Sequence, residues 1–169
     1  MKIDLTIKNI AYTLCFLTRD NRILMLKRNN PPNEGLWNGV GGHLNIGEDP
    51  LNCVLREVKE ETGFVIERPR FCGLLTWEGF EIPSGGLYIF TANAPHGEPI
   101  ACAEGVLEWK INTWVFSSPQ VVSNIHVFGP KILQTDPPPP QRFHFQYRGG
   151  EIQWFKIFPL AQDERLGIS

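Results

Sequence analysis

Residues 42–64 read GHLNIGEDPLNCVLREVKEETGF, and the second half of this segment predicts a helix. Asp49 is a favoured N-cap residue, and Pro50 suits the first helical position. Gly63 is typical of the residue that ends a helix. The apolar residues between them recur at helical spacing and predict one buried stripe, formed by Leu51, Val54, Leu55 and Val58.

Three acidic residues share another face of this helix. Glu57, Glu60 and Glu61 stand at positions i, i+3 and i+4, apart from the apolar stripe. Carboxylates so close repel one another unless a cation lies among them, and hard divalent ions such as Mg²⁺ bind oxygen clusters. A solvated acidic face is the alternative. The glycine-rich loop at residues 39–42, whose backbone can approach a ligand closely, favours the cation site.

The whole segment fits a long pattern, G-x5-E-x7-R-E-U-x-E-E-x-G-U, in which U is a bulky apolar residue. Its nine fixed positions within 23 residues are filled by Gly42, Glu48, Arg56, Glu57, Val58, Glu60, Glu61, Gly63 and Phe64. This pattern is the Nudix box, so the chain resembles the Nudix hydrolases. The resemblance implies an α/β fold, a mixed sheet sandwiched between helices (α/β/α), with the box forming a loop–helix–loop. It also implies metal-dependent cleavage of a diphosphate linkage in a nucleotide-like substrate.

The resemblance further implies roles for the charged residues of the box. Glu60 and Glu61 match metal ligands. Glu57 matches the carboxylate that binds the metal or helps to activate water. Arg56 and Glu48 are expected to support catalysis through an ion pair that orients the helix and the loop, in preference to direct contact with the reacting atoms.

The expected chemistry explains why the site needs so many acids. A diphosphate resists attack by water because its oxygens are negative. Bound Mg²⁺, or Mn²⁺ in its place, neutralises that charge and lowers the pKa of a coordinated water, whose proton a carboxylate accepts. The resemblance implies the Gly41 carbonyl as a backbone ligand of the metal. Many Nudix enzymes add a catalytic, metal-binding glutamate from outside the box; we expect Glu104, with Glu108 in an apparent strand as the alternative.

The residues before the box point to one branch of the family. Residues 35–42 read GLWNGVGG and resemble the G-x-W-N-G-x-G-G run of MutT-type enzymes. These enzymes hydrolyse oxidised purine nucleoside triphosphates such as 8-oxo-dGTP to the monophosphate and pyrophosphate. The asparagine of that run contacts the purine base, so Asn38 is expected to do so here. The alternative is that Asn38 caps a turn as part of an Asn-Gly pair.

Further substrate contacts are expected outside this run. Asn124 falls where MutT-type enzymes place another base-reading asparagine or aspartate. Arg28 ends the second expected strand and is a candidate to contact phosphate, with a solvated strand end as the alternative. Trp37 and Trp77 are candidates to stack on a base, with burial in the core as the alternative.

Other readings of the function stay open. Gly79 stands where ADP-ribose hydrolases usually carry a proline, and the SQPWPFPxS signature of NADH hydrolases is absent. The first alternative is hydrolysis of another nucleoside diphosphate derivative, such as an undamaged dNTP, ADP-ribose or a nucleotide sugar. The second is a non-catalytic module that binds nucleotides. The complete set of box glutamates favours an enzyme.

The rest of the chain reads as part of one domain over residues 1–169. Strands are expected at residues 9–18, 22–27, 64–66, 71–77, 87–92 and 106–111, and a second helix at 123–133. Four consecutive prolines at residues 137–140 predict a stiff spacer. After the spacer, two aromatic-rich runs joined by Arg148-Gly149-Gly150-Glu151 predict a C-terminal hairpin at about residues 142–158.

Composition limits the classes of partner. Hydrophobic residues at 42% and charged residues at 20% of 169 are ordinary for a folded protein. The net charge of −2 argues against charge-driven binding, so we expect a small-molecule nucleotide and no stable nucleic-acid partner. The four cysteines and four histidines lack the spacing of a zinc site. With no signal-peptide pattern and no membrane-spanning run, we expect a cytoplasmic monomer or homodimer.

Overall fold

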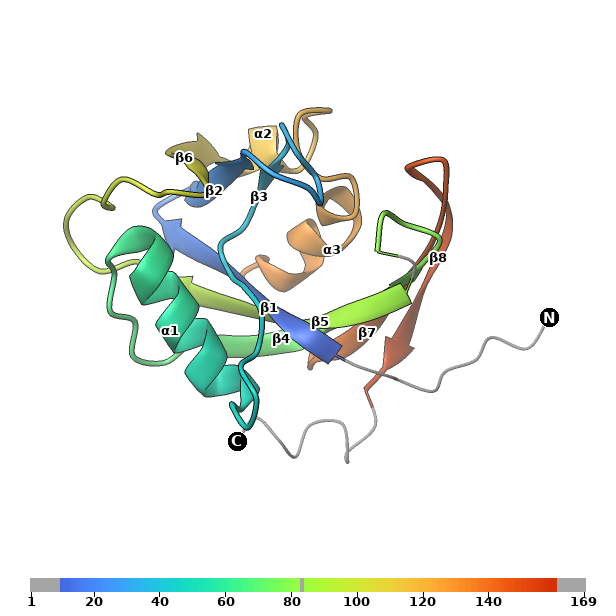
Figure 1. Cartoon of the computed structure of the whole chain (residues 1–169), viewed down its shortest axis with the longest axis horizontal. Helices are drawn as coiled ribbons and strands as arrows, with labels where there is room; N and C mark the ends of the chain where they lie inside the picture. Colours follow the sequence, from blue (N-terminus) through green and yellow to red (C-terminus); the bar gives the residue numbers. More distant parts are fainter. Residues whose placement is uncertain (1–9, 83, 161–169) are drawn as a thin grey trace.

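The computed structural model describes residues 10–82 and 84–160, which form one sheet with helices packed on it (Figure 1). The elements are, in chain order, β1 (Ile10–Arg19), β2 (Arg22–Arg28), β3 (Trp37–Asn38), α1 (Pro50–Thr62), β4 (Arg70–Glu78), β5 (Ser84–Asn93), β6 (Gly105–Ile111), α2 (Asn112–Val115), α3 (Ile125–Ile132), β7 (Gln141–Arg148) and β8 (Glu151–Pro159). The expected α/β class is confirmed.

The sheet is mixed, as the family resemblance implies. Its order is β3-β2-β1-β5-β4-β7-β8, and β6 pairs with β2 off this path. Two pairs, β1 with β5 and β4 with β7, are parallel, whereas the remaining strand pairs are antiparallel. The expected C-terminal hairpin therefore does not stand apart from the domain, because β7 joins the main sheet through β4.

Each face of the sheet is covered by a helix. Side chains alternate along β1, so Leu14 and Phe16 enter one core cluster whereas Cys15 and Leu17 enter another. The first cluster contains Phe128 of α3, and the second contains the buried stripe of α1. Figure 1 shows α1 and α3 on opposite sides of β1, which is the α/β/α arrangement that the resemblance implies.

The strands β1 and β2 separate soon after the turn that joins them. They pair only at Thr18↔Ile23 and Arg19↔Arg22. Nearer the start of β1, the glycine-rich loop takes the place of β2: Thr13 N–H donates to the Gly42 carbonyl at 2.8 Å, and Cys15 N–H donates to the Val40 carbonyl at 2.6 Å. This insertion holds the loop beside β1, directly before α1.

Both helices expected from the sequence are present. Helix α1 begins at Pro50, and the second expected helix is α3, which is shorter at each end than residues 123–133. The four-residue α2 was not expected. No helix in the described part of the chain is long and apolar enough to cross a membrane.

One expected strand is wrong. Residues 64–66 are assigned to no strand and have no pairing partner in the sheet. Their apolar character has another cause, because Phe64 and Ile66 are each 6% exposed and pack into the core cluster beneath α1. The other expected strands are confirmed within a few residues, and the two-residue β3 within the expected loop was missed.

Candidate active site

Helix α1 is fixed at both ends in the way its sequence predicts. The Asp49 carboxylate accepts a hydrogen bond from Asn52 N–H at 2.8 Å. Gly63 adopts a left-handed conformation with φ of 78°, and its N–H donates to the Lys59 carbonyl at 2.9 Å. Between these caps, Val54 and Val58 are fully buried against the sheet. These contacts set the rotation of the helix and thus the direction of its glutamates.

The loop before α1 packs closely against its neighbours at two glycines. A Cβ atom on Gly41 would lie 2.1 Å from the Thr13 carbonyl oxygen of β1. A Cβ atom on Gly42 would lie 2.3 Å from Cδ of the Glu57 carboxylate. The first glycine of the box therefore makes room for the carboxylate of Glu57, which lies directly against the loop backbone.

Among the box glutamates, Glu61 has the pKa that burial shifts furthest from its usual value. It is 5% exposed, and its Oε2 accepts a hydrogen bond from Gly41 N–H at 2.9 Å. Its Oε1 is buried and accepts no hydrogen bond from the described residues. Burial raises the pKa of Glu61 to about 9, the Gly41 N–H opposes the rise, and the nearby Glu104 and Glu57 carboxylates add to it.

Glu104 joins this cluster from the loop before β6. The Glu104 carbonyl accepts from Asn29 N–H at 3.0 Å, which fixes its loop to the end of β2. The negative charge of Glu104 contributes to the raised pKa of both Glu57 and Glu61, so the carboxylates share one small region. Glu108, the alternative considered from the sequence, instead pairs with Lys110 at 2.7 Å on β6 and does not line the cavity.

Arg56 links the loop to the acidic face of α1. Its Nε and Nη2 each donate to the Glu48 carboxylate at 2.8 Å, and its Nη1 donates to Glu57 Oε1 at 2.8 Å. Its Nη2 also donates to the His43 carbonyl at 3.0 Å. The hydrogen bonds from Arg56 hold the pKa of Glu48 down at about 2. This is the supporting ion pair that the sequence predicts.

Glu60 is the most exposed of the box glutamates, and its negative charge also contributes to the raised pKa of Glu57. Its side chain is 59% exposed, and its Oε2 accepts from Arg56 Nη1 at 3.2 Å. No three Asp, Glu, His or Cys side chains in residues 10–82 and 84–160 already form a constellation that would hold a metal ion. The chemistry nevertheless fits a hard divalent cation, because Glu61 Oε1 is buried with no partner among the described residues, and burial together with neighbouring carboxylates raises the pKa of Glu57 and Glu61.

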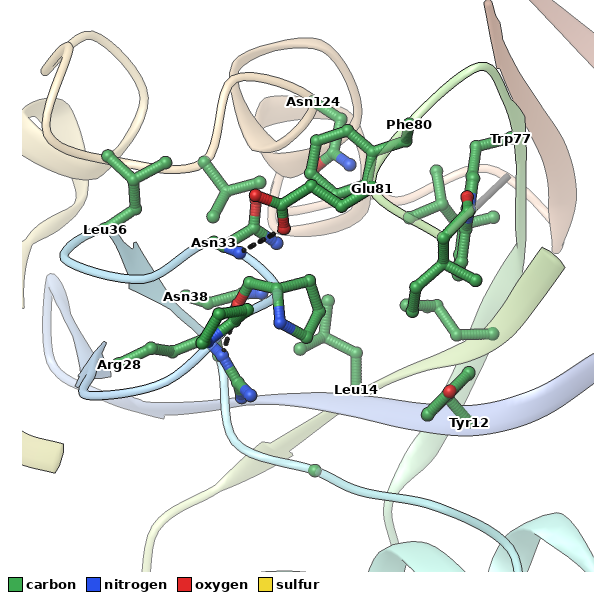
Figure 2. A pocket seen from close by; sticks show the side chains of 18 of the residues that line it. Tyr12, Leu14, Arg28, Asn33, Leu36, Asn38, Trp77, Phe80, Glu81 and Asn124 are labelled. Carbon is green, nitrogen blue, oxygen red and sulfur yellow. Dashed lines mark hydrogen bonds between the residues drawn. The ribbon is translucent and has the colours of Figure 1, made fainter. Parts of the chain in front are cut away.

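A cavity of about 710 Å³ extends from Glu57 and Glu104 to an aromatic region, whereas Glu60 and Glu61 are not among the residues that line it. Glu57, Glu104 and Gly42 line one part of it. Trp77 and Phe80, at the end of β4 and just after it, line another part. Figure 2 shows the side chains around the second part, with Asn38 and Arg28 below and Asn124 and Phe80 above. The cavity is therefore large enough for a nucleotide and is chemically different at its two ends.

The two predicted asparagines both line this cavity. Asn38 is the last residue of β3, its Oδ1 accepts from Gly39 N–H at 2.8 Å, and its amide nitrogen donates to none of the described residues. Asn124 Nδ2 donates to Tyr147 Oη at 3.0 Å. Arg28 also lines the cavity, but its Nε donates to the Pro32 carbonyl at 2.7 Å, which turns its side chain toward the loop that follows β2.

The two tryptophans differ in position. Trp77 lines the cavity, and its Nε1 donates to the Ile82 carbonyl at 2.9 Å. Trp37 does not line the cavity, which corrects the expectation that it contacts substrate. It is 5% exposed because it packs edge-on against Trp114, and the Lys110 ammonium lies 4.5 Å from its ring centroid.

Several residues of the cavity were missed by sequence reasoning. They are Tyr12, Asn33, Phe80, Glu81 and Tyr147. Glu81 Oε2 accepts from Asn33 N–H at 3.2 Å and so joins two loops at the edge of the cavity (Figure 2). The only signal for Tyr147 was the alternation of aromatic residues in the C-terminal hairpin, which predicts a strand but not its neighbour in the sheet.

Comparisons with known proteins agree with this architecture. A family model described as the NUDIX domain matches residues 8–135. An uncharacterised Nudix hydrolase of Bacillus subtilis is 30% identical over 120 residues, which cover 68% of this chain and 74% of that protein. An oxidised purine nucleoside triphosphate hydrolase of Danio rerio is 29% identical over 144 residues, which cover 83% of this chain and 88% of that protein.

A solved structure extends the similarity to three dimensions. The crystal structure of a MutT protein from Bacillus halodurans superposes with a TM-score of 0.75 at 26% identity, covering 89% of this chain and 98% of that one. The glycine-lined loop, the capped helix and its glutamates thus lie in a fold that solved relatives share. The chain belongs to the Nudix family and is a hydrolase that acts on pyrophosphate bonds.

Proposed function

We propose that this hydrolase converts a purine nucleoside triphosphate to the monophosphate and pyrophosphate, with oxidised purines such as 8-oxo-dGTP as its preferred substrates. The observation that carries the proposal is the continuity of the cavity, which is lined by Glu57 and Glu104 and also by Trp77 and Asn124. A nucleotide in this space has its phosphates beside the carboxylates and its base beside the ring and the amide. The volume of about 710 Å³ suits a ligand of this size.

The acids at the phosphate end suit a divalent cation, which Nudix hydrolases generally need. We infer Mg²⁺, with Mn²⁺ as a substitute. Bound there, it would neutralise phosphate charge and make a coordinated water more acidic. The groups that would hold it are Glu57, Glu60, Glu61, Glu104 and the carbonyl of Gly41. Their oxygen atoms are the donors that Mg²⁺ prefers.

The residues of the chain divide the remaining tasks between them. Glu57 lies against Gly42 and accepts a hydrogen bond from Arg56, so its carboxylate is oriented before substrate binds. A carboxylate held in this way can accept the proton of the attacking water. Arg56 contacts Glu48 and the loop backbone as well, and it therefore acts by positioning Glu57.

The base end of the cavity supplies stacking and hydrogen bonding. Trp77 lines the cavity, although it is only 8% exposed, and the amides of Asn38 and Asn124 carry both donors and acceptors. Such groups suit a purine, which carries donors and acceptors around its edge. The similarity to a relative named as an oxidised purine nucleoside triphosphate hydrolase also supports this choice of substrate.

The proposal is tested by measuring pyrophosphate and phosphate release from 8-oxo-dGTP, dGTP, dATP, dCTP, ADP-ribose and a nucleotide sugar, with Mg²⁺ and with a chelator. We expect metal-dependent pyrophosphate release that is fastest with 8-oxo-dGTP. Faster cleavage of ADP-ribose or of the nucleotide sugar would keep the Nudix chemistry and refute the proposed substrate. Absence of turnover with every compound would favour a module that only binds nucleotides.

The assignment of the metal ligands is tested with charge-neutral variants of nearly the same shape. Glu60→Gln and Glu61→Gln are each expected to abolish nearly all Mg²⁺-dependent turnover while the protein stays folded. Glu108→Gln is the matched control, because Glu108 pairs with Lys110 on β6 and does not contribute to the raised pKa of Glu57 or Glu61. Full activity in both of the first two variants would rule out the assignment.

A further inference from the structure

The C-terminal hairpin contributes to the substrate cavity although it lies beyond residue 135, where the match to the family model ends. Strand β7 pairs in parallel with β4, in the register Trp77↔Phe145 and Glu78↔Gln146. Because of this register, Tyr147, the next-to-last residue of β7, lies beside the place where the chain leaves β4. Tyr147 and Gly150 both line the cavity.

The side chain of Tyr147 is held firmly in this position. It is 6% exposed, its ring lies 4.9 Å from the Phe80 ring, and it stacks on Phe145 at 6.2 Å between centroids. Its backbone is fixed as well, because a Cβ atom on Gly79 would lie 2.2 Å from the Tyr147 carbonyl oxygen. The hydroxyl of Tyr147 therefore has a defined place beside the loop that follows β4.

The Tyr147 hydroxyl contacts one group at the base end of the cavity, the amide of Asn124. Asn124 Nδ2 donates to Tyr147 Oη at 3.0 Å. Asn124 precedes α3, yet its side chain does not cap that helix. Among the described residues nothing donates to Asn124 Oδ1, so this acceptor and the second N–H of Nδ2 are left for a ligand, and the bond to Tyr147 fixes the side on which each of them lies. An amide fixed at one end distinguishes donors from acceptors, whereas a freely rotating amide accepts either.

We propose that Tyr147 is a positioning residue for base selection, which orients Asn124 so that the cavity prefers a base with an N–H donor at that edge. This inference rests on the proposed function. Oxidised and undamaged purines differ at this edge, because an 8-oxopurine carries N–H at position 7, where the undamaged purine carries a lone pair. The preference for the oxidised base then depends on a hairpin outside the part that matches the family model.

The direct test is Tyr147→Phe, which removes the hydroxyl and keeps the ring that packs on Phe80. The measured quantity is the ratio of kcat/KM for 8-oxo-dGTP to that for dGTP. We expect the ratio to fall about fivefold, the worth of one hydrogen bond, through KM, with kcat within about twofold. Tyr88→Phe is the matched control, because Tyr88 is a half-buried tyrosine on β5 that does not line the cavity. An unchanged ratio in Tyr147→Phe would refute the proposal.

Variants of Asn124 test the same geometry without disturbing the hairpin. Asn124→Asp offers only acceptors to the ligand, and the Tyr147 hydroxyl can turn to donate to it, so the preference for 8-oxo-dGTP should persist. Asn124→Leu should abolish the preference for 8-oxo-dGTP over dGTP, because leucine offers no hydrogen-bonding group. In the Asn124→Leu background, adding Tyr147→Phe should cause no further loss, because the tyrosine acts only through the amide. Independent, additive losses would overturn the proposal.

A binding measurement separates this inference from the proposed function. Calorimetry with 8-oxo-dGMP and dGMP, in chelator, reports base selection without turnover. If the enzyme hydrolyses none of the triphosphates but Tyr147→Phe still reduces the binding preference for 8-oxo-dGMP, the proposed function fails and the role of Tyr147 stands. If hydrolysis is confirmed and neither the binding nor the kinetic preference changes in Tyr147→Phe, the role of Tyr147 fails alone.

Discussion

The ion pair between Glu48 and Arg56 predicts a measurable change in stability when Glu48 is replaced by glutamine. Glutamine keeps the shape of the side chain but turns one acceptor into a donor that faces the guanidinium. Glu48 now accepts two hydrogen bonds from Arg56 at 2.8 Å and one from Asn45 N–H at 3.1 Å. Its side chain is 14% exposed and that of Arg56 is 27% exposed, so water screens the pair only in part.

The magnitude follows from the titration of Glu48. Its pKa falls from 4.5 to about 2 in the folded protein, chiefly because Arg56 donates to the carboxylate. A shift of this size corresponds to at most about 3 kcal/mol of folding free energy at neutral pH. Screening around the partly exposed guanidinium reduces this to about 2 kcal/mol. For a chain of this length, Glu48→Gln should therefore lower Tm by roughly 4–8 °C.

The sign of the pH dependence is fixed by the direction of the shift. A carboxyl group with a depressed pKa contributes stability above its unfolded value near 4.5, and that contribution is lost as the pH falls toward 2. The difference between the wild type and Glu48→Gln should thus be full at pH 7 and shrink steadily below about pH 4.5.

The assay is urea unfolding in chelator at several pH values, followed by tryptophan fluorescence. Glu108→Gln is the control, because Glu108 forms an exposed pair with Lys110 and should change the unfolding free energy by less than about 1 kcal/mol. A Glu48→Gln variant as stable as this control at pH 7 would refute the reasoning, and so would a difference that does not change down to pH 3.

Three further predictions concern the site and the core. In Gly42→Ala the new methyl group displaces the Glu57 carboxylate, and kcat should fall at least about tenfold in the pyrophosphate assay while KM changes little. In Phe128→Ala a fully buried ring between Phe16 and Phe143 is lost, and urea unfolding should show a loss of about 3–5 kcal/mol. Saturating Mg²⁺ should raise the Tm of the wild type and should not raise that of Glu61→Gln, as scanning calorimetry with and without chelator would show.

Each of these predictions has an outcome that contradicts it. Unchanged kcat in Gly42→Ala would mean that Glu57 tolerates displacement and is not the oriented group. A loss below about 1 kcal/mol in Phe128→Ala would mean that the core under α3 closes around the gap. An equal rise of Tm in Glu61→Gln would place the cation away from Glu61.

The sequence predicts the phosphate end of the site well because its residues lie close together in the chain. The caps at Asp49 and Gly63 set the limits of α1, and helical spacing then places Glu57 and Glu61 on one side of it. Glu104 was expected from the resemblance to the family, and the structure brings it next to these two acids. The metal-binding and catalytic roles of these residues stay predictions until turnover is measured.

The base end is hard to predict because it depends on pairing between distant strands. Tyr147 reaches the cavity only through the parallel pairing of β7 with β4, which joins segments far apart in the sequence. Trp37 shows the opposite case: it was a candidate to stack on a base, with burial in the core as the alternative, and its side chain packs in the core. The expected strand at residues 64–66 failed since apolar composition does not reveal whether a partner strand exists.

The insertion of the glycine loop beside β1 has a consequence for how the site moves. Thr13 and Cys15 donate to the loop, Val40 N–H donates back to Cys15 at 3.1 Å, and β1 pairs along its other edge with β5. These amide protons should exchange with solvent only when the whole sheet opens, on the slow timescale of global unfolding. The Asn33 amide proton, which is donated to the exposed Glu81 carboxylate, should instead exchange by local fluctuation. The glycine loop beside the carboxylates should therefore be as rigid as the centre of the sheet, whereas motion on a fast timescale should be confined to the loops at the edge of the cavity.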